Sequence, residues 1–149
     1  MPILIPELRP DGTLVMHATC VSRNGRGVLI CGPSGAGKSA LALKLMVLGA
    51  GLVADDRTIL RHNNGTLVAS VPAALDGIIE ARGVGILNAV PSIPTTVQLC
   101  VDLSAVETER LPPLRSVCLL GVAIPLLNAI PYDHFGPAIL QYLTYGRHS

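Results

Sequence analysis

The residues best suited to chemistry form one glycine-rich stretch, Gly32-Pro33-Ser34-Gly35-Ala36-Gly37-Lys38-Ser39. It fits the pattern G-x-x-x-x-G-K-[ST] of a phosphate-binding P-loop. Glycines let the backbone curl so that successive N–H groups point at phosphate oxygens. Lys38 would reach the outer phosphates as a point charge, and the Ser39 hydroxyl would ligate Mg²⁺. The alternative is a plain turn without a ligand, which has no need of a lysine and a serine at these positions.

A strand before this loop and a helix after it must position it. Val28 to Cys31 is a short apolar run typical of a strand, and residues 40–48 are rich in helix-forming Ala, Leu, Lys and Met. Upstream, residues 14–21 predict a strand that turns back through Asn24-Gly25 into the strand before the loop. His17 lies in that first strand, where a structural role and a role in the site are both open.

Two acids follow the next strand-like run, because Leu52 to Ala54 leads directly into Asp55 and Asp56. The carboxyl end of a strand after a P-loop helix is where an open α/β sheet holds catalytic groups. We expect one acid to hold Mg²⁺, directly or through water, and the other to accept a proton from an attacking hydroxyl. The alternative is an Asp-Asp turn that caps the following segment.

A carboxylate and a guanidinium, Glu80 and Arg82, lie two residues apart in the apolar, glycine-spaced segment 76–88. Buried charges need partners or metal ions. The pair therefore either forms an internal salt bridge or belongs to a site, and the residues alone leave both open.

The remaining chain reads as further strands and one helix. Asn64-Gly65 predicts a second hairpin, and residues 97–101 predict a strand that ends before Asp102 in an exposed polar stretch. Residues 115–122 predict another strand, and residues 136–145 a C-terminal helix.

Composition bounds the class of protein. The chain has 149 residues, and this length predicts a single domain that spans residues 1–149. A net charge of +1 gives no electrostatic case for nucleic acid, and no run of eighteen apolar residues predicts a membrane span. The sequence shows no secretion signal, and its four cysteines lack metal-site spacing, so reduced core cysteines in a cytoplasmic protein are expected. They are Cys20, Cys31, Cys100 and Cys118.

Four segments together resemble the catalytic domain of HPr kinase/phosphorylase, in the short form without a separate N-terminal domain. They are Met16-His17, Gly32 to Ser39, Leu52 to Asp56, and Ile79 to Ile86, the last being close to the family's E-x-R-G-x-G-I segment. The resemblance covers roughly residues 14–128. It implies an α/β fold of the P-loop kinase type shared with phosphoenolpyruvate carboxykinases, with a central mixed sheet and flanking helices.

The resemblance also implies a reaction: Mg²⁺-dependent transfer of the terminal phosphoryl group of ATP to a serine of HPr. HPr is the small carrier of the sugar phosphotransferase system, through which carbon metabolism is regulated. In the family the same site can run phosphorolysis, in which phosphate attacks phosphoserine and pyrophosphate leaves. Members are commonly hexamers whose site lies near subunit contacts.

Site roles follow from the same resemblance. Residues 32–39 would hold the nucleotide phosphates, with Lys38 catalytic, and Ser39 and Glu80 match the Mg²⁺ positions, to which Asp55 is added as a possible ligand. The other catalytic positions are Asp56 for the serine proton, His17 as the active-site histidine, Arg82 in the signature segment, and Arg110, in Glu109-Arg110-Leu111, as a further family arginine.

The chain departs from the longer members at residues 128–135, where they carry a basic segment associated with phosphorolysis and this sequence has no arginine. This departure leaves the phosphorylase direction and the acceptor protein open. Two other functions stay under consideration: a sensor that binds ATP and a partner but transfers nothing, and a small-molecule kinase on the same fold.

Overall fold

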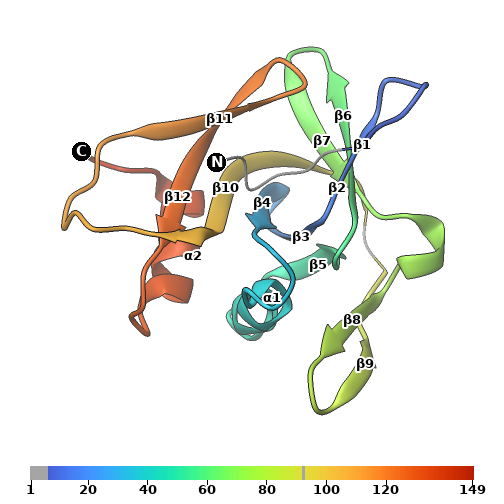
Figure 1. Ribbon diagram of the computed structural model, residues 1–149, viewed down its shortest axis with the longest axis horizontal. Coiled ribbons are helices and arrows are strands. Elements are labelled where there is room, and N and C mark those ends of the chain that lie inside the picture. Colours follow the sequence, from blue (N-terminus) through green and yellow to red (C-terminus); the bar gives the residue numbers. More distant parts are fainter. Residues whose placement is uncertain (1–6, 92) are drawn as a thin grey trace.

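The computed structural model describes residues 7–91 and 93–149 (Figure 1). In this part of the chain, two α-helices accompany one large mixed sheet and a small two-stranded sheet. The elements are β1 (Glu7–Leu8), β2 (Leu14–Met16), β3 (Ala18–Arg23), β4 (Arg26–Cys31), α1 (Lys38–Val47), β5 (Gly51–Ala54), β6 (Thr58–Asn63), β7 (Thr66–Ser70), the 3₁₀ turn η1 (Ala73–Leu75), β8 (Ile78–Ala81), β9 (Gly85–Asn88), β10 (Thr95–Val106), β11 (Arg115–Leu119), β12 (Val122–Ala129) and α2 (Phe135–Tyr145).

Three parallel strands form the centre of the large sheet. β10 runs parallel to β4 on one side and to β12 on the other, with Cys100 opposite Leu29 and Leu126. The other strand pairs of the sheet are antiparallel. Because the carboxyl ends of β4, β10 and β12 face the same edge, the P-loop after β4 opens at the edge where α/β sheets bind ligands.

Side chains alternate between the two faces of these strands. On one face, Val28 and Ile30 pack against α1 and α2, which also contact each other. On the other face, Leu29 and Cys31 pack against side chains from β2, β6, β7, β11 and β12, including Leu60. The expected mixed sheet is confirmed, but both helices cover one face because the curled sheet covers the other with its own strands.

The local turn predictions are confirmed. The hairpins β3–β4 and β6–β7 turn at Asn24-Gly25 and Asn64-Gly65, and all four residues have positive φ. A two-residue turn with positive φ at both positions matches the right-handed twist of the paired strands. The C-terminal helix predicted at 136–145 is α2, and the helix predicted at 40–48 begins two residues earlier, at Lys38.

Three strand predictions were wrong in their extent. The strand expected at 14–21 is interrupted at His17, because β2 pairs with β6 whereas β3 pairs with β4 and β5. Asp102 is buried inside β10 rather than exposed after a strand, and its carboxylate accepts hydrogen bonds from the amide and hydroxyl of Ser104. The strand expected at 115–122 is split by a turn at Leu120-Gly121, after which β12 was not foreseen.

The cysteines are free thiols, as expected, and three of the four are buried. Cys118 is exposed on β11. Burial raises the pKa of the Cys20 thiol, so this side chain acts as a small apolar core residue. Within the described residues, neither helix is long and apolar enough to cross a membrane.

Candidate active site

The P-loop is shaped by glycines that no other residue could replace without strain. Gly37 takes φ 98° at the N-terminal cap of α1. Gly32 takes φ 149°, and a Cβ there would lie 3.2 Å from the Cβ of Ala36 and 3.3 Å from that of Leu103. The loop can therefore curl tightly between β4 and α1, which is the shape that directs backbone N–H groups toward a bound anion.

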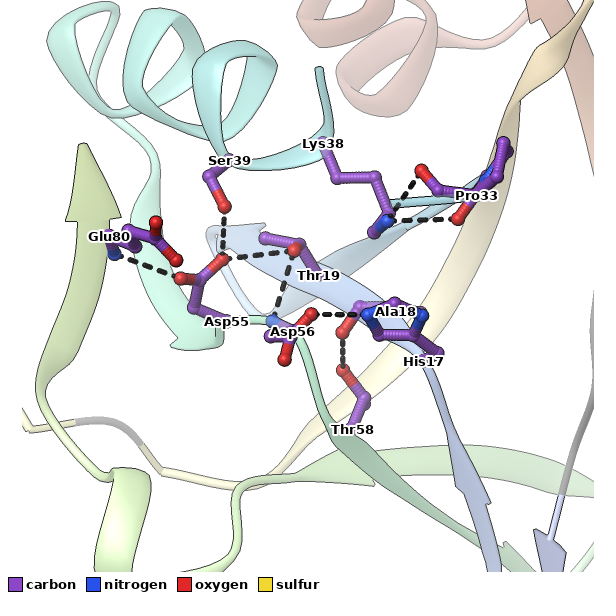
Figure 2. Close-up of polar contacts among 11 residues, drawn as sticks. His17, Ala18, Thr19, Pro33, Lys38, Ser39, Asp55, Asp56, Thr58 and Glu80 are labelled. Atoms are coloured by element: carbon purple, nitrogen blue, oxygen red, sulfur yellow. Dashed lines mark hydrogen bonds and ion pairs between the residues drawn. The ribbon is translucent and has the colours of Figure 1, made fainter. Parts of the chain in front are cut away.

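Lys38 brings the positive charge of the loop. Its side chain is buried, and its Nζ donates hydrogen bonds to the carbonyls of Gly32 at 2.8 Å and Pro33 at 3.0 Å (Figure 2). The ammonium group is thus held inside the curl of the loop, where a P-loop lysine contacts phosphate oxygens.

Asp55 is fixed by donors from three separate elements. Its Oδ1 accepts hydrogen bonds from Ser39 Oγ at 2.6 Å and Thr19 Oγ1 at 3.1 Å, and its Oδ2 accepts one from the Glu80 amide at 2.9 Å. Figure 2 shows the carboxylate between α1, β3 and β8. A buried carboxylate needs such partners, and the pairing of a P-loop hydroxyl with a strand-end aspartate is the Mg²⁺-holding arrangement of P-loop enzymes.

Asp56 lies on the solvent side of the same turn. Its φ is 68°, an uncommon value for a non-glycine residue that aspartate tolerates better than most. Its Oδ1 is hydrogen-bonded to Nε2 of His17, and the two side chains are 60% and 48% exposed. An accessible carboxylate paired with an imidazole is equipped to take up a proton from an incoming hydroxyl.

Thr19 is the site residue that sequence reasoning missed. It is fully buried, donates to Asp55 and accepts a hydrogen bond from the Asp56 amide at 3.2 Å. The available signal was its spacing of two from His17, which suggests a shared strand face. Threonine is so common in strands that this signal has little weight alone.

Lys38, Ser39 and Asp56 border a cleft of about 460 Å³ between the P-loop and the β8–β9 hairpin. Glu80 and Arg82 reach it from the hairpin, and both are exposed, so the expectation of buried charges there was wrong. Among the described residues, no salt bridge joins the two. The cleft is lined by Ser34, Gly35, Gly37, Lys38, Ser39, Ala40, Leu43, Asp56, Glu80, Ala81, Arg82 and Val84.

Arg110 is not brought to this cleft. It lies exposed between β10 and β11, and it does not line the cleft. Nearby, Arg115 pairs with Glu107 at 3.1 Å and Glu109 at 3.8 Å, and its hydrogen bond lowers the pKa of the Glu107 carboxyl. A larger hollow of about 590 Å³, between α1 and the start of α2, is lined by none of the predicted site residues.

The donor set of the site fits Mg²⁺ better than a softer metal. Across residues 7–91 and 93–149, no three His, Cys, Asp or Glu side chains cluster as a metal cage. Mg²⁺ needs few protein ligands, since it keeps several waters and binds through one or two carboxylates plus substrate phosphates. The Ser39 hydroxyl, the Asp55 carboxylate and the Glu80 side chain at the cleft supply such oxygens.

Comparison with known proteins agrees with the geometry. The sequence profile of the HPr Serine kinase C-terminal domain matches residues 12–112. Over 85 residues the chain is 41% identical to the HPr kinase/phosphorylase of Clostridium botulinum (strain Eklund 17B / Type B), covering 57% of this chain and 27% of that protein. Over 83 residues it is 45% identical to the HPr kinase/phosphorylase of Listeria welshimeri, covering 55% and 27%.

A solved structure is similar over most of the fold. The Hpr(Ser) kinase/phosphatase from Coxiella burnetii superimposes with a TM-score of 0.68 at 27% identity, covering 87% of this chain and 93% of that one. The chain spans about a quarter of the length of the curated relatives it matches.

Proposed function

The chain belongs to the HPr serine kinase C-terminal domain family, and from this premise we propose that it transfers the terminal phosphoryl group of ATP to a serine of an HPr-like phosphocarrier protein. The observation that carries the proposal is the shared cleft, which is bordered by Lys38, Ser39 and Asp56 together. A pure nucleotide sensor needs the P-loop but has no use for the accessible Asp56–His17 pair beside it.

Each residue has a separate task in this reaction. The P-loop amides and Lys38 hold the phosphates in line with the acceptor, because phosphoryl transfer depends mainly on positioning and charge neutralisation. Asp56 accepts the proton of the serine hydroxyl as its oxygen attacks the terminal phosphorus, and His17 orients that carboxylate through its hydrogen bond.

Ser39, Asp55 and Glu80 would hold Mg²⁺, which when bound neutralises charge on the phosphate oxygens. The Ser39 hydroxyl hydrogen points to Asp55, an acceptor, so the remaining lone pairs of Ser39 are free to face a cation. Arg82, exposed at the cleft, is placed to meet anionic groups from the open side.

We also propose a second reaction, a homo-oligomeric state, a cytoplasmic location and a role for Arg110. Relatives carry the words phosphorylase and phosphatase in their names, which supports phosphorolysis of phosphoserine to pyrophosphate as a second reaction of this site. Assembly into a homo-oligomer, a cytoplasmic location and a role for Arg110 rest on the family resemblance.

The test is incubation of the purified protein with terminally labelled ATP, Mg²⁺ and candidate HPr-like carriers. We expect label on a carrier serine, and we expect Lys38→Ala to lower the transfer rate by at least about 100-fold, because it removes the charge facing the phosphates. ATP binding without label on any carrier would instead favour the sensor. Adding phosphate to the labelled carrier then tests phosphorolysis through the release of pyrophosphate.

A further inference from the structure

We propose that Thr19 is a positioning residue. It holds both the metal-binding Asp55 and the proton-accepting Asp56 in the positions that the reaction needs. Its effect on phosphate transfer rests on the proposed function, whereas its effect on the two aspartates does not. None of the four segments that resemble the family includes Thr19, which lies on β3 two positions after His17.

The geometry places the Thr19 hydroxyl in contact with both Asp55 and Asp56. The hydroxyl of Thr19 is 3.1 Å from Asp55 Oδ1 and 3.2 Å from the Asp56 amide nitrogen (Figure 2). The residue is fully buried, so water cannot substitute for either contact without a local rearrangement. One side chain therefore holds the carboxylate of the first acid and the backbone of the second.

The direction of both hydrogen bonds is determined by the partners. A hydroxyl has one hydrogen to donate and two lone pairs to accept with. An ionised Asp55 can only accept and the Asp56 amide can only donate, so the hydroxyl hydrogen points to Asp55 and a lone pair points to Asp56. Neither valine nor alanine can replace this relay, whereas serine can.

The relay matters most at Asp56, whose φ of 68° is a strained value for a residue with a side chain. Such a conformation persists only where surrounding contacts hold it. Two of these contacts come from neighbouring residues of the chain. Thr19 on β3 accepts a hydrogen bond from the Asp56 amide, and His17, just before β3, is hydrogen-bonded to the Asp56 carboxylate. Without the hydroxyl, the backbone would be free to relax and the carboxylate would leave its position in the cleft.

Two substitutions separate positioning from packing. Thr19→Val keeps the side-chain shape and removes the hydroxyl, and Thr19→Ser keeps the hydroxyl. The matched control is Thr95→Val, which removes the hydroxyl of another buried threonine, bonded to the Gly25 carbonyl at 3.1 Å, away from the cleft. For each variant we would measure kcat for transfer, the Kd for Mg-ATP, and hydrogen exchange of the peptide that spans residues 52–57.

We expect Thr19→Val to lower kcat at least about tenfold with the Mg-ATP Kd within about threefold, since misplaced catalytic groups slow chemistry more than they weaken binding. Exchange in the 52–57 peptide should speed up at least about tenfold, because the Asp56 amide loses its acceptor. Thr19→Ser should restore both, and Thr95→Val should change neither.

The proposal is overturned if Thr19→Val leaves exchange in that peptide unchanged, or if it speeds up exchange and slows transfer no more than Thr95→Val does. It is also overturned if Thr19→Ser is as impaired as Thr19→Val. If the unaltered protein labels no carrier, the proposed function fails, and the exchange measurement alone decides whether Thr19 holds the aspartates.

Discussion

The two walls of the cleft are built in opposite ways. The wall formed by the P-loop and the end of β5 is anchored in the core through Lys38 and Asp55, which are only 6% and 8% exposed, and it presents the exposed carboxylate of Asp56 to the cleft. The wall formed by the β8–β9 hairpin projects from the body of the molecule (Figure 1). Every residue of β9 is exposed, Ile86 among them at 71%, and Val84, which lines the cleft, is 76% exposed.

In the described part of the chain, the hairpin wall is anchored through β8 and through its base. Ile79 is buried in the cluster that also contains α1 and α2, and the neighbouring Glu80 amide bonds Asp55. The Ala89 amide closes the base by donating to the Gly77 carbonyl at 2.7 Å. Lys38 and Asp55 therefore lie on the wall that belongs to the core, whereas Glu80 and Arg82 lie on the wall with fewer buried contacts, which is the one able to shift when an acceptor arrives.

The largest expected effect tests the chemistry assigned to the core wall. Asp56→Asn should lower the transfer rate by about 10² to 10⁴, since the amide cannot accept the serine proton. Its affinity for Mg-ATP should stay within about threefold because the P-loop is untouched, and asparagine tolerates the positive φ of this position. Single-turnover transfer and an ATP titration measure the two quantities. Transfer at the normal rate would remove Asp56 from the role of proton acceptor.

The next effect compares the two strands of the hairpin. Ile79→Ala should lower the free energy of unfolding by about 2–4 kcal/mol, because it empties a fully buried site. Ile86→Ala, on the exposed strand of the same hairpin, should change it by less than about 0.5 kcal/mol. Urea unfolding of both variants gives the comparison. Equal losses would mean that the whole hairpin is packed, and the contrast between the walls would be wrong.

The smallest effect concerns the charge that the hairpin wall brings to the cleft. Arg82→Ala should leave the free energy of unfolding within about 0.5 kcal/mol, since the side chain is exposed. It should lower kcat/KM for the carrier protein about tenfold through the loss of one favourable charge interaction. Steady-state kinetics with varied carrier, beside thermal unfolding, measure both. A large loss of stability would show that Arg82 holds the hairpin rather than meeting the substrate.

The same contrast separates what sequence could predict from what it could not. Three local signals could be predicted, because each acts within a few residues of chain: the glycine spacing of the P-loop, the Asn-Gly turns and the acids at the end of β5. The link through Thr19 joins residues 36 positions apart and exists only because β3 pairs with β5. No local pattern encodes that pairing.

Two errors have the same physical origin. The break at His17 arises because the chain leaves one strand partner for another, and the burial of Asp102 arises because β10 continues between β4 and β12. Both depend on neighbours that are distant in sequence. The wrong prediction that Glu80 and Arg82 are buried has the same origin. The apolar segment that carries them projects as a hairpin instead of entering the core.

The parallel pairing of β4 with β10 also bears on how the protein folds. One edge of the P-loop strand is covered by its hairpin partner β3, which forms quickly because the turn is short. The other edge is covered only when β10 pairs with it. The hydrogen bond of Thr95 to Gly25 then closes a loop between residues that lie 70 positions apart. Long-range parallel pairing is slow and leaves strand edges uncovered meanwhile. The strand that precedes the P-loop is therefore exposed to wrong strand partners until β10, near the start of the last third of the chain, pairs with it.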